Sequence, residues 1–150
     1  MAIDLTKLKQ LREETGASVS DCRLAIEESG GDYAQSLAWL QKRAAQKAEK
    51  KEGRETGEGL VECYIHQNGK IGAMVAVLCE TDFVAKTDDF KKLTHEIAMQ
   101  VAAMNPQDVA TLMQQEYIKD TSVTIEKLIK QTIGKLGENI TVKNFVRFAI

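Results

Sequence analysis

The stretch from residue 60 to residue 79, LVECYIHQNGKIGAMVAVLC, decides the fold of this chain. It contains two apolar segments, Leu60–His66 and Ile71–Cys79, on either side of the tetrapeptide Gln67-Asn68-Gly69-Lys70. An Asn-Gly pair between two such segments is a strong hairpin signal, because both residues tolerate the positive φ of a type I′ turn. The sequence therefore predicts an antiparallel β-hairpin.

Both faces of this hairpin are expected to be apolar. With Asn68-Gly69 as the loop, Cys63 lies opposite Met74. One face then carries Val61, Cys63, Ile65, Met74 and Ala76, and the other carries Leu60, Tyr64, Ile71, Val75 and Val77. A sheet with one face in water would alternate apolar and polar residues. We therefore expect helices of this chain on one face, and either more of this chain or a second copy on the other.

Two amphipathic helices and a third strand are predicted after the hairpin. The first helix places apolar residues at steps of three and four, in Phe90, Leu93, Ile97, Val101 and Met104. The second helix runs from Ile125 to Leu136 and stops at Gly137. The third strand follows from alternating apolar residues, Ile140, Val142, Val146, Phe148 and Ile150. The expected fold class is α+β, with a three-stranded antiparallel sheet packed with helices on one side.

The first third of the chain predicts three short helices, separated by Gly16 and by Gly30-Gly31. A charged, Ala-rich segment, 42–58, follows these helices. We interpret it as a solvated helix end plus linker; the alternative is a weak RNA contact, although its small excess of positive charge gives little attraction to phosphate. We therefore divide the chain into an N-terminal domain with its linker, 1–54, and an α+β core, 55–150.

Composition excludes several classes of function. A net charge of -2 and a pI near 5.8 argue against a dedicated nucleic-acid binder. No apolar run is long enough to span a membrane, and the start of the chain lacks a signal peptide, so we expect a cytoplasmic protein. Three cysteines and two histidines form no spacing typical of a metal site, and nucleotide-binding and hydrolase motifs are absent. We expect no metal, no cofactor and no enzymatic activity.

One stretch, CETDFVAK at residues 79–86, is not explained by structure alone. It leaves a buried strand and carries Phe83 and Val84 into a connection that should be polar. Phe83 either folds back into the core or projects as an anchor for a partner, since exposed aromatic residues flanked by charge are typical binding hot spots. The residues alone leave both interpretations open.

The same stretch resembles the signature of bacterial elongation factor Ts, the nucleotide-exchange factor for the GTPase elongation factor Tu. Three further segments agree in order and spacing: LREETGA at 11–17, YIH at 64–66 and LGENI at 136–140. The resemblance covers nearly the whole chain. It implies an N-terminal three-helix domain like ubiquitin-associated domains, an α+β core, and nucleotide exchange on elongation factor Tu in translation elongation. The alternative function is that of a ribosome- or RNA-associated helical adaptor.

The resemblance also implies site residues. In the family, the TDFV stretch acts on the partner's nucleotide domain and dislodges the Mg²⁺ that holds the guanine nucleotide. By motif, this role falls on Thr81, Asp82, Phe83 and Val84. The N-terminal domain of the family grips the same partner domain, which here points to Arg12, Val19 and Ser20.

This chain departs from the family in two respects. It has one core half where long members have two, and short members dimerise through the core sheet, so the resemblance implies a homodimer. In addition, only residues 107–116 separate Asn105-Pro106 from Tyr117-Ile118, where relatives carry a longer helical insertion. This departure leaves the geometry of the dimer open.

Overall fold

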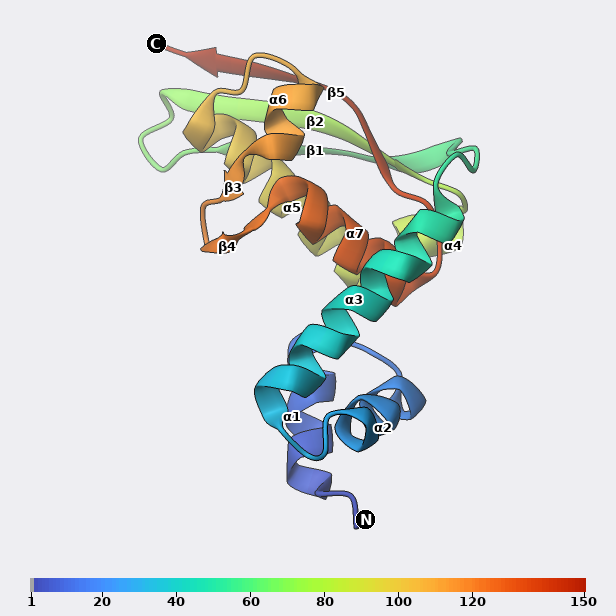
Figure 1. The fold of residues 1–150 in the computed structure, drawn as a ribbon. Coiled ribbons are helices and arrows are strands. Elements are labelled where there is room, and N and C mark those ends of the chain that lie inside the picture. Colours follow the sequence, from blue (N-terminus) through green and yellow to red (C-terminus); the bar gives the residue numbers. More distant parts are fainter. Residues whose placement is uncertain (1) are drawn as a thin grey trace.

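The computed structural model describes residues 2–150 and has the α+β architecture that the sequence predicts (Figure 1). Three helices form an N-terminal bundle, and a three-stranded sheet with its covering helices forms the core. The helices are α1 (Leu5–Thr15), α2 (Val19–Glu28), α3 (Tyr33–Lys51), α4 (Asp82–Ala85), α5 (Asp88–Met104), α6 (Val109–Gln114) and α7 (Ile125–Leu136). The strands are β1 (Glu58–Ile65), β2 (Ile71–Cys79), β3 (Glu116–Tyr117), β4 (Asp120–Thr124) and β5 (Thr141–Ala149).

The N-terminal bundle is built from locally capped helices around a small core. Gly16 ends α1 with a φ of 65°, which confirms the boundary expected there, and the Ser18 hydroxyl caps α2 by accepting from the amide of Asp21. The buried side chains are Leu11, Cys22, Ala25, Ile26 and Leu40, with Trp39 partly buried against them. Leu5, the first residue of α1, lies outside this core and is 76% exposed.

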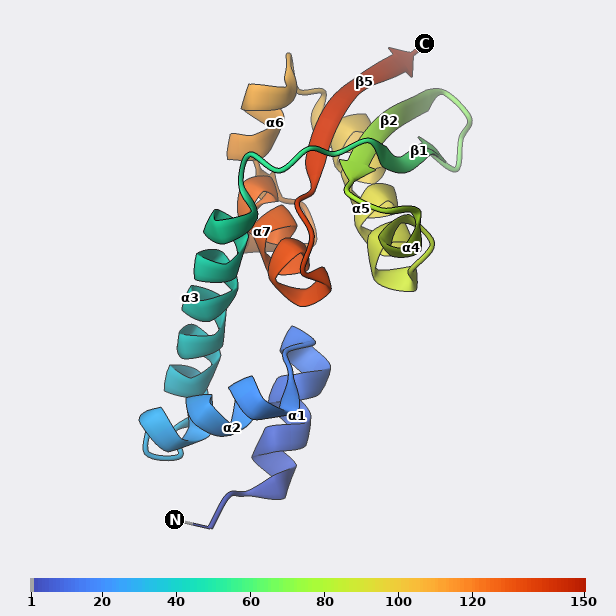
Figure 2. The ribbon, with the colours of Figure 1, turned by 90° about the vertical axis from the view of Figure 1, so that its right-hand side faces the viewer.

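Helix α3 does not end with the bundle but continues to the core, as Figure 2 shows. Ala44 packs so closely on Gly134 of α7 that a Cβ added at Gly134 would lie 2.9 Å from the Cα of Ala44. One turn later, Ala48 is 3% exposed and belongs to the core cluster. The interpretation of this segment as solvated was wrong for these two alanines. Their small side chains are what allow the helices to approach.

The sheet has the order β1-β2-β5, with both pairs antiparallel. Cys63 pairs with Met74, which confirms the register expected for the hairpin. The prediction of a type I′ turn is wrong. Within residues 2–150, Asn105 is the non-glycine residue with positive φ, so Asn68 does not adopt the conformation that this turn requires. Instead, the amide of Gly69 donates to the carbonyl of His66 at 2.8 Å, and Gly69 alone takes a positive φ of 70°.

A β-bulge in β5 decides which side chains reach the core. Ala76 pairs with Asn144 whereas Val77 pairs with Val142, so Lys143 is an extra residue in β5. Val142 therefore packs on the core, while Val146 and Phe148 lie on the opposite face and are 44% and 73% exposed. The simple alternation from Ile140 to Ile150 was wrong, because a one-residue insertion exchanges the two faces.

The two faces of the sheet have different surroundings. Helices α5, α6 and α7 lie on one side of it (Figure 1), and Phe90, Leu93, Ile97 and Val101 of α5 are buried there as predicted. Met104 at the end of α5 is 50% exposed, which the periodicity did not predict. The outer face carries exposed apolar side chains from all three strands: Val61, Ile65, Met74, Val146 and Phe148. The sheet is thus apolar on both faces but covered by this chain on one.

Buried polar groups attach the small β3–β4 hairpin, which the sequence did not predict, to α5. The Glu96 carboxylate, 6% exposed, accepts hydrogen bonds from the Tyr117 hydroxyl and from Lys119 Nζ, the latter at 2.7 Å. Burial alone would raise the pKa of Glu96, but these two bonds outweigh it and hold the pKa below its ordinary value. Burial, together with the bond to Glu96, raises the pKa of Tyr117.

The close contact between α3 and α7 predicts that one methyl group added at Gly134 destabilises the fold. Gly134→Ala should lower the free energy of unfolding by ~1–2 kcal/mol, since overpacking against the Ala44 backbone outweighs the better helix propensity of alanine. Thermal unfolding should show a loss of a few degrees in Tm. Gly57→Ala is the matched control, because a Cβ there meets no atom within 4 Å. An unchanged Tm in Gly134→Ala would mean that the two helices separate at no cost.

Candidate partner-binding site

The predicted TDFV site is a single short helix at the end of β2. Residue 81 is extended and caps α4, with the Thr81 hydroxyl accepting from the amide of Val84 at 3.4 Å. Phe83 lies on the outer side of this turn and is 80% exposed. The structure therefore favours the projecting orientation of Phe83 over the one in which it folds back into the core.

The remaining side chains of α4 divide between surface and core. Val84 packs partly against the core cluster and Ala85 is 4% exposed, so the helix rests on its C-terminal half. Asp82 is exposed and pairs with Lys86 at 3.0 Å. The hydrogen bond from Lys86 holds the pKa of Asp82 below its ordinary value, so this carboxylate is ionised at neutral pH. Phe83 thus projects beside a negative charge.

Two carboxylates that are not among the predicted site residues bind the segments at the N-terminal end of α4. Glu138, in the turn after α7, accepts two hydrogen bonds from Thr81, and Glu80 accepts one from the amide of Asn139. Arg54 lies 3.7 Å from Glu80. Glu138 and Thr81 are 57 residues apart, and no local pattern could have paired them. The only signal was that both fall in segments that resemble the same family.

The predicted N-terminal residues form a second surface. Arg12 of α1 and Ser20 of α2 are exposed, and Val19 is 42% exposed. They lie on either side of the turn between the two helices, on the N-terminal bundle, whereas α4 lies beside α5 in the core (Figure 2). The structure therefore does not bring the two predicted groups together. They are two separate surfaces, one on the N-terminal bundle and one on the core.

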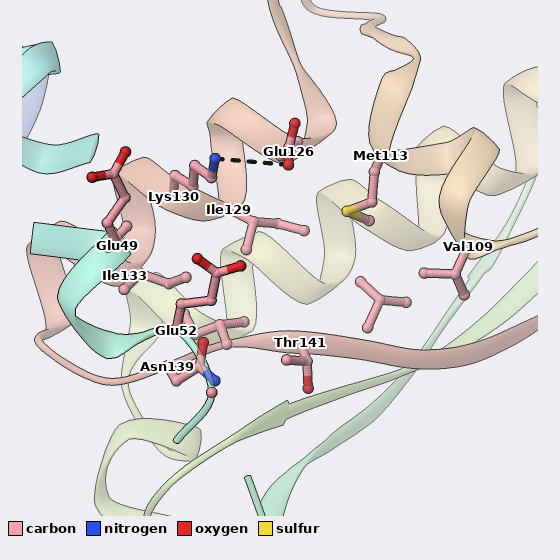
Figure 3. Close-up of a pocket in the computed structure, with 14 residues that line it drawn as sticks. Glu49, Glu52, Val109, Met113, Glu126, Ile129, Lys130, Ile133, Asn139 and Thr141 are labelled. Atoms are coloured by element: carbon pink, nitrogen blue, oxygen red, sulfur yellow. Dashed lines mark ion pairs between the residues drawn. The ribbon is translucent and has the colours of Figure 1, made fainter. Parts of the chain in front are cut away.

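A separate hollow of about 300 Å³ lies where the end of α3 meets α6, α7 and the start of β5 (Figure 3). Its apolar lining includes Ile129, Ile133 and Met113, and charged groups stand around it, with an ion pair of 3.7 Å between Glu126 and Lys130. None of the predicted site residues lines this hollow. It is therefore not part of the TDFV site.

Two further features bear on the kind of site. Among residues 2–150, no group of three or more His, Cys, Asp or Glu side chains is placed to hold a metal ion. In the same range, no helix has the length and hydropathy that crossing a membrane requires.

Comparisons with known proteins agree with this picture. A family model described as "Elongation factor TS" matches residues 80–150. Elongation factor Ts of Coprothermobacter proteolyticus is 40% identical, and the match covers 100% of this chain and 99% of that protein. Elongation factor Ts of Fervidobacterium nodosum is 38% identical with the same coverage, and that of Synechococcus sp. (strain JA-3-3Ab) is 40% identical over 100% of this chain and 70% of its own length.

The alignment with the Coprothermobacter protein runs over 195 positions, whereas this chain has 150 residues. The relative therefore carries about 45 residues for which this chain has no counterpart. The fold, the exposed α4 and these full-length matches define a bacterial translation elongation factor. The chain belongs to the elongation factor Ts family, and its function is guanine-nucleotide exchange on elongation factor Tu.

Proposed function

We propose that α4 acts on the nucleotide domain of elongation factor Tu and dislodges the Mg²⁺ that holds the guanine nucleotide. Thr81, Asp82, Phe83 and Val84 form the acting element, with Phe83 as the anchor that enters the partner. The observation that carries this proposal is the 80% exposure of Phe83 on a helix whose other end is packed into the core. A large apolar side chain presented in this way is typical of a binding hot spot.

Linkage sets the energy that this mechanism requires. An exchange factor that binds the nucleotide-free GTPase more tightly than the loaded one must lower nucleotide affinity by the same factor. Each tenfold change requires ~1.4 kcal/mol of differential binding. Burial of one phenylalanine supplies ~1.5–3 kcal/mol, so Phe83 accounts for one or two factors of ten. Loss of Mg²⁺ coordination and a second contact must supply the remainder.

We propose that the N-terminal bundle makes this second contact. Arg12, Val19 and Ser20 are exposed around the turn between α1 and α2, where a partner can reach them. Because α3 packs on α7, the bundle and the core form a continuous body that can grip the partner at two places. The N-terminal contact then raises affinity, and α4 acts on the nucleotide site.

We further propose that two copies of the chain pair through the outer face of the sheet. Met74, Val146 and Phe148 are among the apolar side chains exposed there, although a protein in water normally leaves no such continuous patch uncovered. A depression of about 240 Å³ between these side chains and Ile150 offers space for side chains of a second copy. Pairing would give the complex two core halves.

The remaining parts of the proposal concern enzymatic activity, cellular location and contact with RNA. We propose that it acts by binding, not as an enzyme, and that it works in the cytoplasm, where its partner functions. Direct contact with RNA is disfavoured, because three of the bases in the charged segment, Arg43, Lys47 and Arg54, already lie close to carboxylates. Lys47 Nζ lies 2.6 Å from the Asp21 carboxylate and Arg43 Nε lies 3.8 Å from it.

Phe83→Ala tests the anchor. We expect GDP release from elongation factor Tu to slow by ~10–100-fold in stopped-flow measurements with labelled GDP, because the apolar anchor is lost. The fold should be unaffected, since the side chain is exposed. Met104→Ala, at another exposed apolar position, is the control and should exchange normally. A Phe83→Ala variant with the wild-type rate would contradict the proposal.

Arg12→Ala tests the second contact. We expect the concentration of exchange factor needed for half-maximal GDP release to rise by ~3–10-fold, since a lost contact of about 1 kcal/mol weakens binding by that order. The rate at saturation should change much less, because α4 is intact. Arg23→Ala removes the same charge from an exposed position in α2 and serves as the control. Equal effects of the two variants would mean that Arg12 acts only through its charge and makes no specific contact with the partner.

Light scattering tests the homodimer. The wild-type chain should have a mass near twice 16.6 kDa. Met74→Glu should give the monomer mass, because pairing would bury an unpaired carboxylate in an apolar interface. Leu24→Glu places the same charge on α2 at a similarly exposed position and should leave the dimer intact. A monomeric wild-type chain would exclude this pairing.

A further inference from the structure

The α4 helix is attached to a distant part of the chain through one carboxylate. The amide of Thr81 donates to Glu138 Oε1 at 2.9 Å, and the Thr81 hydroxyl donates to Glu138 Oε2 at 2.7 Å. Both oxygens of Glu138 are thus occupied by a single residue. Hydrogen bonds to an ionised carboxylate are roughly twice as strong as those between neutral groups, so this is a firm attachment for a partly exposed site.

Glu80 and Asn139, the sequence neighbours of Thr81 and Glu138, form a similar hydrogen bond with the carboxylate and the amide exchanged between the two segments. Glu80 Oε1 accepts from the amide of Asn139 at 2.8 Å, and Asn139 Nδ2 donates to the carbonyl of Arg54 at 2.9 Å. Each of the two segments therefore supplies a carboxylate that binds the backbone of the other. We call these four residues, Glu80, Thr81, Glu138 and Asn139, the crossed clamp.

The crossed clamp controls the N-terminal end of α4. The Thr81 hydroxyl donates to Glu138 and also accepts from the amide of Val84, so Glu138 fixes the rotamer in which Thr81 caps the helix. A helix of four residues has no stability of its own. Its C-terminal half is held by packing of Val84 and Ala85, and its N-terminal half by the crossed clamp. Phe83 lies between these two attachments.

We propose that Glu138 is a positioning residue for nucleotide exchange, because through Thr81 it holds α4 in the orientation that presents Phe83 to the partner. This inference rests on the role proposed above for Phe83. When the clamp is broken, α4 populates other orientations. The rate of exchange then falls in proportion to the fraction of molecules that remain competent. The first encounter with the partner, which also involves the N-terminal bundle, is affected less.

Glu138→Ala tests the positioning role, because it removes both acceptors. At saturating exchange factor, we expect GDP release from elongation factor Tu to slow by ~5–20-fold, with the half-saturating concentration changed by less than about threefold. Glu138→Gln is the conservative variant: its amide oxygen accepts from the Thr81 amide and its NH₂ donates to the Thr81 hydroxyl oxygen. It should recover most of the rate. Glu126→Ala removes a carboxylate from α7 that binds only Lys130, and should exchange normally.

A double variant shows whether Glu138 acts through Phe83. In the Phe83→Ala background, adding Glu138→Ala should slow release by less than about twofold, because the residue that it positions is already gone. Full additivity of the two effects would mean that Glu138 contacts the partner directly, which overturns the positioning role. A normal rate for Glu138→Ala alongside a slow Phe83→Ala overturns this inference alone. A normal rate for Phe83→Ala overturns the proposed function itself.

Glu80→Ala provides an independent measurement where Glu138→Ala does not fold. It breaks the other half of the crossed clamp and leaves the bonds between Glu138 and Thr81 in place. We expect a smaller slowing of release, of about three- to fivefold, at saturating exchange factor. Thermal unfolding of each variant separates this effect from loss of the fold. A folded Glu80→Ala variant with the wild-type rate would count against the clamp.

Discussion

The close approach of α3 and α7 at Ala44 and Gly134 determines how the two parts of the molecule are joined. The N-terminal bundle is joined to the core mainly through one long helix, α3, which packs against α7. Lys135 of α7 reaches over Gly16, at the turn between α1 and α2, and adds a second contact. A side chain at Gly134 would push α3 outward and move Arg12 relative to Phe83.

Local signals in the sequence were sufficient for much of the fold. The register of Cys63 with Met74 follows from the short loop, and the end of α1 follows from Gly16, which adopts a positive φ readily. The bulge at Lys143 could not be predicted in this way, because alternation only counts residues and does not show where one has been inserted. The burial of Ala48 was also missed, since alanine within a charged segment carries no apolar pattern.

The candidate site shows the same division between local and distant contacts. Phe83 and its flanking charges could be recognised from one continuous stretch, and its exposure agrees with the role that the family resemblance implies. The residues that bind this stretch could not be recognised from the sequence. Glu138 binds Thr81 across 57 residues, and it does so only because α7 returns the chain to the end of β2. Chain topology, and not local pattern, places a carboxylate there.

The position of Trp39 provides an optical reporter within the molecule. It is the only tryptophan of the chain, and it packs in the N-terminal bundle, five residues before Ala44 on α3. Its emission therefore reports mainly on the packing of the bundle, whereas far-UV circular dichroism reports on the helices and strands of the bundle and the core together. Coincident melting curves from the two signals would indicate one cooperative unit, and a change of emission at the lower temperature would indicate that the bundle loosens first.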